Sequence, residues 1–509
     1  MMPQQRKRTA TRVLMINWDN YPNSTSGGVY AWVKQMVDNL PEVEFSVFNV
    51  LSNPNINGSY KVPGNVVRVM EIPLYGCQRY EEFYGAGGKG LTAKILRTDE
   101  SFIKKKFVPL FEKFAKELVS DSCDHSALGS LAGELHSMLA AHDVKKCAEH
   151  PATFRAFAGL LAQDDLYRSV QMKEAVDLFS FVQRILQILS VRLPEVDLVH
   201  SSNAWIPAFA GICAKVDFGC PMIATEHGVA FKDLLLYHRL YIHNEAYNIL
   251  WKVISNNIIR TVYRAADVVA PVCAANATMA EMLHTPSSKI RVIYNGVDSD
   301  KFRPLATMDR PDRPTVVFVG RIELLKDVLS LIQAISYVKE TVPDVLCLIY
   351  GSSTDFEYAR ACMKLVRELK LEENVKFMGP TKNPEQAYNA GDVVVLSSIR
   401  EGFPYTVVEA MACGKAVVST DVGGVREALE NYGMLARSRH PYELADALAK
   451  LLSDRRVRNE LGEMSRRIVD KKFTIQGSIE SYRSLYSELL NGGGSGSIGK
   501  GERKRGYME

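Results

Sequence analysis

Two glutamates and the start of a predicted helix lie together near the middle of the second half of the chain. Val393–Leu396 is an apolar run typical of a buried strand, and Tyr405–Cys413 has the pattern of a helix that Pro404 precedes. Unpaired amides at a helix start attract anions. The amides of Tyr405, Thr406 and Val407 therefore predict a site for a diphosphate, with the loop residues Phe403 and Pro404 beside it.

Glu401 and Glu409 flank this helix start. Glu409 falls about one turn inside the helix, roughly 6 Å beyond its first residue. A carboxylate is a poor neighbour for a phosphate, but it accepts hydrogen bonds from sugar hydroxyls. We therefore expect Glu409 to bind a ribose and Glu401 to contact a transferred group. A lone pair of solvated glutamates would have the same spacing, so the interpretation depends on the neighbouring motifs.

A pair of cations follows another predicted strand, Val316–Val319. Gly320 keeps the turn narrow, and Arg321 and Lys326 come next. Two cations at the end of a strand neutralise a leaving diphosphate without a metal ion, so we expect no metal site. The alternative is an ordinary Arg and Lys at the entry of a surface helix.

The first half of the chain supplies weaker candidates. Gly27 and Gly28 follow the first predicted strand and open the first helix, where they suit a loop against donor phosphate or acceptor. His227 and His200 each follow a predicted strand, so each is a candidate to bind a sugar hydroxyl or the incoming nucleophile. A lone histidine is more often structural, and that alternative is stronger for His200.

Two series of strands and helices must position these residues. Short β-branched runs separated by helix-length segments predict parallel sheets with crossover helices. We expect an α/β fold of two doubly wound, Rossmann-like domains facing a cleft, at residues 12–300 and 301–472, joined at a proline-rich linker. The strands expected besides the two named above are Val13–Ile16, Val66–Met70, Leu198-Val199, Met222–Ala224, Val268–Val272, Val292–Tyr294, Leu346–Tyr350, Val375–Met378 and Ala416–Ser419.

A helical insertion interrupts the first domain at about residues 75–193. Phe107, Phe111, Phe114 and Leu118 repeat at helical spacing there. A lid, a partner contact, an acceptor site and extra scaffold all remain open for it. A last amphipathic helix is expected at 473–490.

The composition points to a globular enzyme without a membrane span. The chain has 509 residues, 47% hydrophobic and 24% charged, with a net charge of +4, which does not call for nucleic acid as a partner. The nine cysteines include no C-x-x-C pair, which favours reduced thiols in the cytoplasm. A basic leader (1–11) and a Gly-rich basic tail (491–509) are expected to be unstructured. The tail could contact anionic lipid at the inner face of the membrane or a partner, but a solvated tail is the favoured interpretation.

Together these motifs resemble the family 4 retaining glycosyltransferases of the GT-B fold. The resemblance covers most of residues 12–490 and is strongest in the second domain, and it is closest to enzymes of exopolysaccharide synthesis. The motifs that carry it are Ser-Gly-Gly at 26–28, Glu-His-Gly at 226–228, Asn-Gly-Val-Asp at 295–298, Gly320-Arg321 with Lys326, Glu401 with Glu409, and Gly-Gly-x-x-Glu at 423–427.

The resemblance implies metal-independent transfer of a sugar from a UDP-sugar to a glycan or polysaccharide acceptor, with retained anomeric configuration and no cofactor. Membrane-associated synthase subunits are further candidate partners. The roles implied are ribose binding for Glu409, donor-sugar contact for Glu401 and His227, stabilisation of departing UDP for Arg321 and Lys326, uracil contact for the backbone of Met378 and Gly379, acceptor contact for Lys232, and packing of the helix 473–490 on the first domain.

Two other functions fit the same residues. A nucleotide-sugar epimerase or another GT-B enzyme could use the scaffold, and a non-catalytic subunit could bind a nucleotide sugar for a polysaccharide synthase. Release of UDP from a UDP-sugar separates the transferase from both.

Overall fold

Two parallel six-stranded sheets form the framework of the protein. The computed structural model describes residues 10–23, 27–52, 61–75, 79, 89–228, 244–305, 311–353 and 355–492. The first sheet has the order β3-β2-β1-β4-β5-β6 and the second the order β12-β11-β10-β7-β8-β9. The strands are β1 Thr11–Trp18, β2 Val43–Leu51, β3 Val66–Pro73, β4 Leu198–Ser201, β5 Met222–Glu226, β6 Val268–Pro271, β7 Thr315–Val319, β8 Leu346–Tyr350, β9 Val375–Gly379, β10 Val393–Leu396, β11 Ala416–Thr420 and β12 Met434–Ala436.

Both sheets share one winding, which confirms the expected pair of Rossmann-like domains. Numbered within its own domain, each sheet has the strand order 3-2-1-4-5-6. In such sheets ligands bind beyond the carboxyl ends of the strands, where the winding reverses. That point lies between β1 and β4 in the N-terminal domain and between β7 and β10 in the C-terminal domain.

Apolar runs form these strands because helices cover both faces of each sheet. Val13, Leu14, Met15 and Ile16 of β1 are each fully buried. The helices of the N-terminal domain outside the insertion are α1 Gly28–Asn39, α10 Phe209–Phe218, α12 Glu245–Ala265 and α13 Ala274–Met282. Those of the C-terminal domain are α14 Val328–Thr341, α15 Phe356–Glu368, α16 Pro384–Ala390, α17 Tyr405–Ala412, α18 Val425–Leu429, α19 Pro441–Ser453 and α20 Arg455–Lys472.

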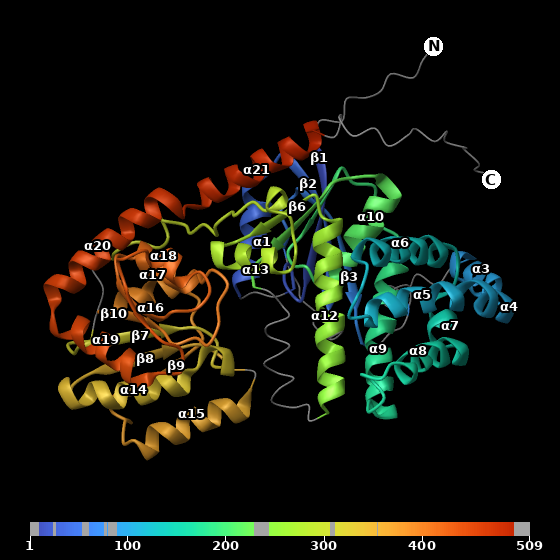
Figure 1. Cartoon of the computed structure of the whole chain (residues 1–509). Coiled ribbons are helices and arrows are strands. Elements are labelled where there is room, and N and C mark those ends of the chain that lie inside the picture. The colour runs from blue at the N-terminus through green and yellow to red at the C-terminus, as the bar shows by residue number, and fades with distance from the viewer. Residues whose placement is uncertain are drawn as a thin grey trace, which may run out of the picture.

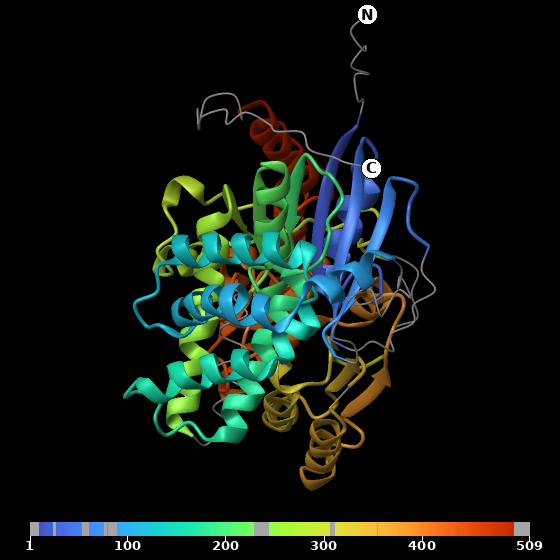
Figure 2. The ribbon, with the colours of Figure 1, turned by 90° about the vertical axis from the view of Figure 1, so that its right-hand side faces the viewer.

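Between β3 and β4 the chain forms a layer of helices on the side of the N-terminal domain that faces away from the C-terminal domain (Figures 1 and 2). Phe107, Phe111, Phe114 and Leu118 are fully buried in the same core as the sheet residues Leu14 and Ile16, so the layer extends the main core. Its helices are α3 Lys89–Arg97, α4 Glu100–Phe102, α5 Val108–Val119, α6 His125–Ala141, α7 Val144–Glu149, α8 Pro151–Gln163 and α9 Met172–Leu189.

The last helix, α21 (Ile475–Gly492), leaves the C-terminal domain and packs on the N-terminal one (Figure 1). Ile479, Tyr482, Leu485 and Tyr486 lie in one apolar cluster with β1 and α1 residues. The chain therefore crosses between the domains twice, and Val297 and Thr474 pair where the two crossings meet.

Val292–Tyr294 does not form the predicted strand. The segment runs beside β6 with two backbone bonds, from the Arg291 amide to the Val269 carbonyl and from the Ile293 amide to the Pro271 carbonyl, both 3.0 Å. The chain then turns toward the C-terminal domain, so no ladder develops. Among the described residues, no helix is both long and apolar enough to cross a membrane. The predicted leader and tail lie almost wholly outside the described residues.

Candidate active site

The loops that follow β7 and β10 meet at the reversal point of the C-terminal sheet. The Ser397 hydroxyl donates to the Lys326 carbonyl at 2.8 Å, and the Ile399 amide donates to the Leu325 carbonyl at 2.8 Å. The Thr406 hydroxyl at the start of α17 donates to the Val319 carbonyl at 3.2 Å. These bonds hold the two loops and the helix start as one unit at the edge where a ligand is expected.

Lys326 and Glu401 form an ion pair within this unit. Lys326 Nζ lies 2.5 Å from Glu401 Oε1, and the two side chains are only 19% and 11% exposed. The Ser398 hydroxyl donates to the same oxygen at 2.6 Å. The structure thus brings two predicted catalytic residues together, with a third group fixing the carboxylate.

Arg321 lies on the same loop but is placed differently. Its side chain is 66% exposed and pairs with Glu323 at 3.0 Å. Arg321 and Lys326 therefore do not point to one place as expected, and of the two it is Lys326 that the fold holds in place.

Glu409 is partly buried on α17 and is held by a tyrosine. The Tyr388 hydroxyl, from α16, donates to Glu409 Oε2 at 2.7 Å. Burial raises the pKa of Glu409 to about 7, and burial together with the Glu409 carboxylate raises the pKa of Tyr388 well above its usual range. The bond uses one carboxylate oxygen and leaves Oε1 for another donor.

The start of α17 differs in two ways from the expectation. The Val407 amide already bonds to the Pro404 carbonyl at 3.2 Å, so it belongs to the first helical turn rather than to a ligand. Phe403 is 4% exposed and packs against Phe473 and Tyr294. The prediction that the Phe403 side chain contacts the donor is therefore wrong. Its ring is a core residue, because it is buried where the domains join.

Three glycines bring the ends of β7, β8 and β9 together. The Gly320 amide bonds to the Tyr350 carbonyl and the Gly351 amide to the Gly379 carbonyl, both at 2.9 Å. A Cβ on Gly351 would lie 1.8 Å from the Gly320 oxygen. Gly379 has a φ of 75°, and Met378 beside it is 48% exposed. The predicted uracil-contacting turn therefore lies at the same sheet edge as the β7 loop.

The N-terminal domain contacts this unit through the first loop. A Cβ on Gly28 would lie 3.1 Å from the Tyr405 ring, and Gly27 has a φ of 109° that favours glycine. The Tyr405 hydroxyl approaches Gln35 Oε1 of α1 at 3.4 Å. The starts of α1 and α17 thus face each other across the domain interface.

His227 lies at the same interface, just after β5. Its Nε2 is buried and has no hydrogen-bond partner among the described residues, and burial lowers its pKa to about 3, so the imidazole is neutral. Its ring packs on Trp32, with centroids 4.8 Å apart. A Cβ on Gly402 would lie 1.6 Å from the His227 carbonyl oxygen, so the two backbones touch beside Glu401.

His200 is a structural residue rather than an acceptor contact. It is fully buried, with Nδ1 2.6 Å from the Tyr486 hydroxyl and Nε2 2.7 Å from Thr225 Oγ1. Because β4 continues to Ser201, His200 lies inside the strand and both ring nitrogens are used by the protein. Lys232, the other acceptor candidate, lies outside the described residues.

Sequence reasoning missed Tyr388, Ser398 and Trp32. Tyr388 lies on a helix 21 positions from Glu409, and only the packing of α16 against α17 brings them together. Of the three, only Ser398 could have been found from the sequence, since it lies three residues before Glu401 in the same loop.

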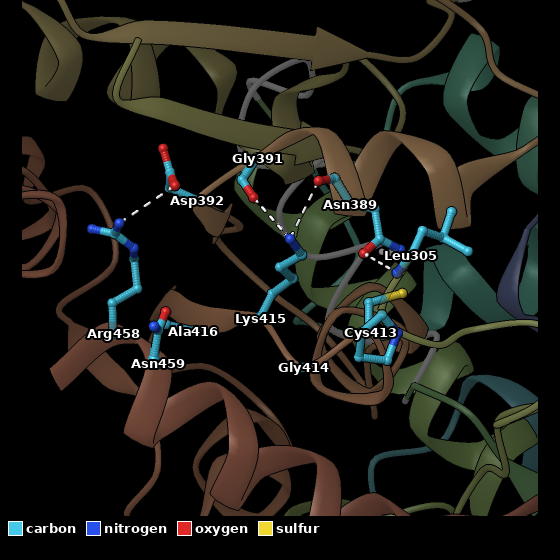
Figure 3. A pocket seen from close by; sticks show the side chains of 11 residues that line it. Leu305, Asn389, Gly391, Asp392, Cys413, Gly414, Lys415, Ala416, Arg458 and Asn459 are labelled. Atoms are coloured by element: carbon cyan, nitrogen blue, oxygen red, sulfur yellow. Dashed lines mark hydrogen bonds and ion pairs between the residues drawn. The ribbon is translucent and has the colours of Figure 1, made fainter. Parts of the chain in front are cut away.

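A cavity of about 160 Å³ lies elsewhere in the C-terminal domain. Figure 3 shows Lys415 pointing toward Asn389 and Gly391, and Arg458 pairing with Asp392 at 3.4 Å. Gly391-Asp392 and Gly414-Lys415 precede β10 and β11, so the cavity lies at the amino ends of these strands, opposite the unit described above.

Two family profiles match the chain. The profile described as "Glycosyl transferases group 1" matches residues 306–468, and the profile "Domain of unknown function (DUF3492)" matches residues 11–287, more than half of the chain. The chain is 30% identical to D-inositol 3-phosphate glycosyltransferase from Corynebacterium jeikeium, over 59% of this chain and 74% of that protein. It is 26% identical to N-acetyl-alpha-D-glucosaminyl L-malate synthase from Bacillus anthracis, over 48% of this chain but 65%, less than two thirds, of that protein.

Solved structures share the whole architecture. Sucrose-phosphate synthase from Thermosynechococcus elongatus superposes with a TM-score of 0.61 at 18% identity, covering 95% of this chain and all of that one. HepE from Anabaena, solved with UDP-glucose, superposes with a TM-score of 0.58 at 15% identity, covering 94% of this chain and 99% of that one. At such identities the likeness concerns the fold. With two Rossmann-like domains meeting at their ligand-binding edges and a curated relative matched over 74% of its length, the chain belongs to the group 1 glycosyltransferases of the GT-B fold.

Proposed function

We propose that the protein transfers a sugar from a UDP-sugar to a glycan or polysaccharide acceptor, with retained anomeric configuration and without a metal ion. The observation that supports this most is the Lys326–Glu401 pair beside the start of α17, at the reversal point of the C-terminal sheet. A cation, a carboxylate and a helix start at one place suit a diphosphate joined to a sugar.

The ion pair gives each member a role when the donor binds. A diphosphate carries more negative charge than one carboxylate, so Lys326 turns from Glu401 toward the phosphate oxygens. Glu401 keeps its hydrogen bond from the Ser398 hydroxyl. Once Lys326 has turned away, the carboxylate can accept hydrogen bonds from sugar hydroxyls. Arg321, which is mostly exposed, adds a second cation when it turns inward.

The nucleoside is assigned to the other residues of the same edge. Glu409 accepts hydrogen bonds from the ribose through Oε1, while Tyr388 holds Oε2. The backbone at Met378 and Gly379 contacts uracil at the end of β9. Because all of these residues belong to the C-terminal domain, that domain binds UDP by itself.

Transfer requires the N-terminal domain. His227 has a neutral imidazole whose Nε2 finds no hydrogen-bond partner within the described part of the chain, and we assign it to the donor sugar near the reacting carbon. The acceptor hydroxyl attacks the sugar C1 from the face that UDP leaves. The C1–O bond to phosphate breaks, and the acceptor proton passes to the departing phosphate oxygen. Lys326 and Arg321 stabilise the charge that grows on UDP.

One neighbour of the same fold supports the donor class, since HepE was solved with UDP-glucose. The relative from Corynebacterium, named a glycosyltransferase, supports sugar transfer. The motif pattern favours a PelF-type enzyme of exopolysaccharide synthesis that works in the cytoplasm beside membrane-associated synthase subunits.

A panel of UDP- and GDP-sugars tests the proposal. Purified protein should slowly release UDP from one UDP-sugar, faster with the right acceptor, and EDTA should leave the rate unchanged. Conversion of the sugar without UDP release would identify an epimerase. Binding without either reaction would identify a non-catalytic subunit, and loss of activity in EDTA would contradict the metal-independent step.

A further inference from the structure

A carboxylate of the C-terminal domain accepts hydrogen bonds from the first amide of a helix in the N-terminal domain. Glu427, on α18, accepts hydrogen bonds from the Ala274 amide at 2.8 Å through Oε2 and at 3.1 Å through Oε1. The Tyr294 hydroxyl donates to Oε1 at 2.5 Å. Tyr294 precedes the first crossing of the chain between the domains, so the Glu427 side chain joins both domains close to that crossing.

Helix α13 depends on this contact for its cap. The residue that precedes it, Cys273, makes no side-chain capping bond. The first amides of a helix have no partner within the helix, and they carry a partial positive charge that favours an acidic group. Glu427 supplies that group from the other domain, which binds α13 to α18 only when the domains have this relative orientation.

The same place sets the spacing of the active-site loops. A Cβ on Gly424 would lie 2.8 Å from Cys273 Cβ, so the start of α18 touches the start of α13. The Gly424 amide bonds to the Gly402 carbonyl at 2.7 Å, which ties α18 to the loop of Glu401. Gly402 in turn touches the His227 backbone. A shift at Glu427 therefore changes the distance between His227 and Glu401.

We infer that Glu427 is a positioning residue that holds the two domains in the orientation required for sugar transfer. The inference rests on the proposed function for its catalytic consequence, but the orientation itself can be measured without any substrate. Since UDP is assigned to the C-terminal domain alone, loss of Glu427 should impair transfer and spare nucleotide binding.

Small-angle X-ray scattering of the ligand-free full chain tests the orientation, with Glu427→Ala, Glu427→Gln and Arg426→Ala compared with wild type. Arg426 is the matched control, since it lies on the same helix and pairs with Asp421 in its own domain. Glu427→Ala should increase the radius of gyration, Glu427→Gln should largely restore it because the amide oxygen still accepts from Ala274, and Arg426→Ala should match wild type.

Kinetics test the consequence. Glu427→Ala should lower kcat for UDP release from the active UDP-sugar by about tenfold or more, with UDP affinity by calorimetry within about twofold of wild type. Tyr294→Phe, which leaves the helix cap intact, should shift both readouts in the same direction by less, and it carries the test if the alanine variant does not fold.

Unchanged scattering and unchanged kcat in Glu427→Ala, or in Tyr294→Phe where it replaces that variant, would overturn the inference. A lower melting temperature of Glu427→Ala with wild-type kcat would also overturn the inference, because Glu427 would then only cap the helix α13. Failure of the proposed function differs from failure of this inference. If the proposed function is wrong, wild-type protein releases no UDP, whereas the scattering difference between Glu427→Ala and wild type would remain.

Discussion

Lys326 Nζ lies 2.5 Å from Glu401 Oε1, and both side chains are largely shielded from solvent. The two residues come from loops after β7 and β10, which the parallel sheet places side by side. Glu401 thus pairs with the cation that the proposed function assigns to the donor diphosphate. In the proposed function the diphosphate replaces Glu401 as the anion at Lys326, and Glu401 keeps its hydrogen bond from Ser398.

Replacement of Lys326 by Ala should lower kcat by about 10²–10³-fold, because the proposed function has the lysine act on charge that grows as UDP departs. UDP affinity should fall much less. Steady-state kinetics of UDP release measures kcat and calorimetry measures UDP affinity. Lys364→Ala is the control, since Lys364 is exposed on α15 and pairs with Glu368. A change confined to KM would show uniform binding instead of transition-state stabilisation.

Glu409 should make stability depend on pH. Between the ordinary carboxyl pKa of about 4.5 and its raised value of about 7, the folded protein binds more protons than the unfolded chain. The free energy of unfolding therefore falls as pH rises through this window, by up to about 3 kcal/mol from this group. Thermal melts across the window should show that Glu409→Gln has a flatter pH profile than wild type. Parallel profiles would contradict the raised pKa.

His200→Ala should destabilise the N-terminal domain without changing acceptor use. The Tyr486 and Thr225 hydroxyls would lose a buried partner, which costs about 2 kcal/mol or more. The melting temperature should fall by several degrees, while the exposed His440→Ala stays at the wild-type value. Wild-type stability with a raised KM for acceptor would restore the original assignment.

The sequence predicted two parallel sheets but not their strands β2 and β12, and it predicted Lys326 and Glu401 in strand-end loops but not their ion pair. The part that was predicted has a geometric reason. Apolar runs mark buried parallel strands, and the carboxyl ends of such strands lie at one edge. His200 was misplaced because its strand continues two residues beyond the apolar pair Leu198-Val199, which puts the ring inside the core.

Partners set by packing were not predictable. Tyr388 reaches Glu409 only because α16 lies beside α17, and Glu427 reaches Ala274 only because the domains dock. No local pattern encodes either distance. The motif around Glu427 was visible in the sequence, but its contact with another domain was not.

Titration of UDP by calorimetry into wild-type protein, Glu409→Ala and the exposed control Glu368→Ala measures whether the C-terminal sheet edge binds the nucleotide. Wild type and the control should bind UDP equally, and Glu409→Ala should lose about 1–3 kcal/mol of binding free energy with the proposed ribose contact. No UDP binding by wild type, or equal affinity in all three proteins, would contradict this prediction.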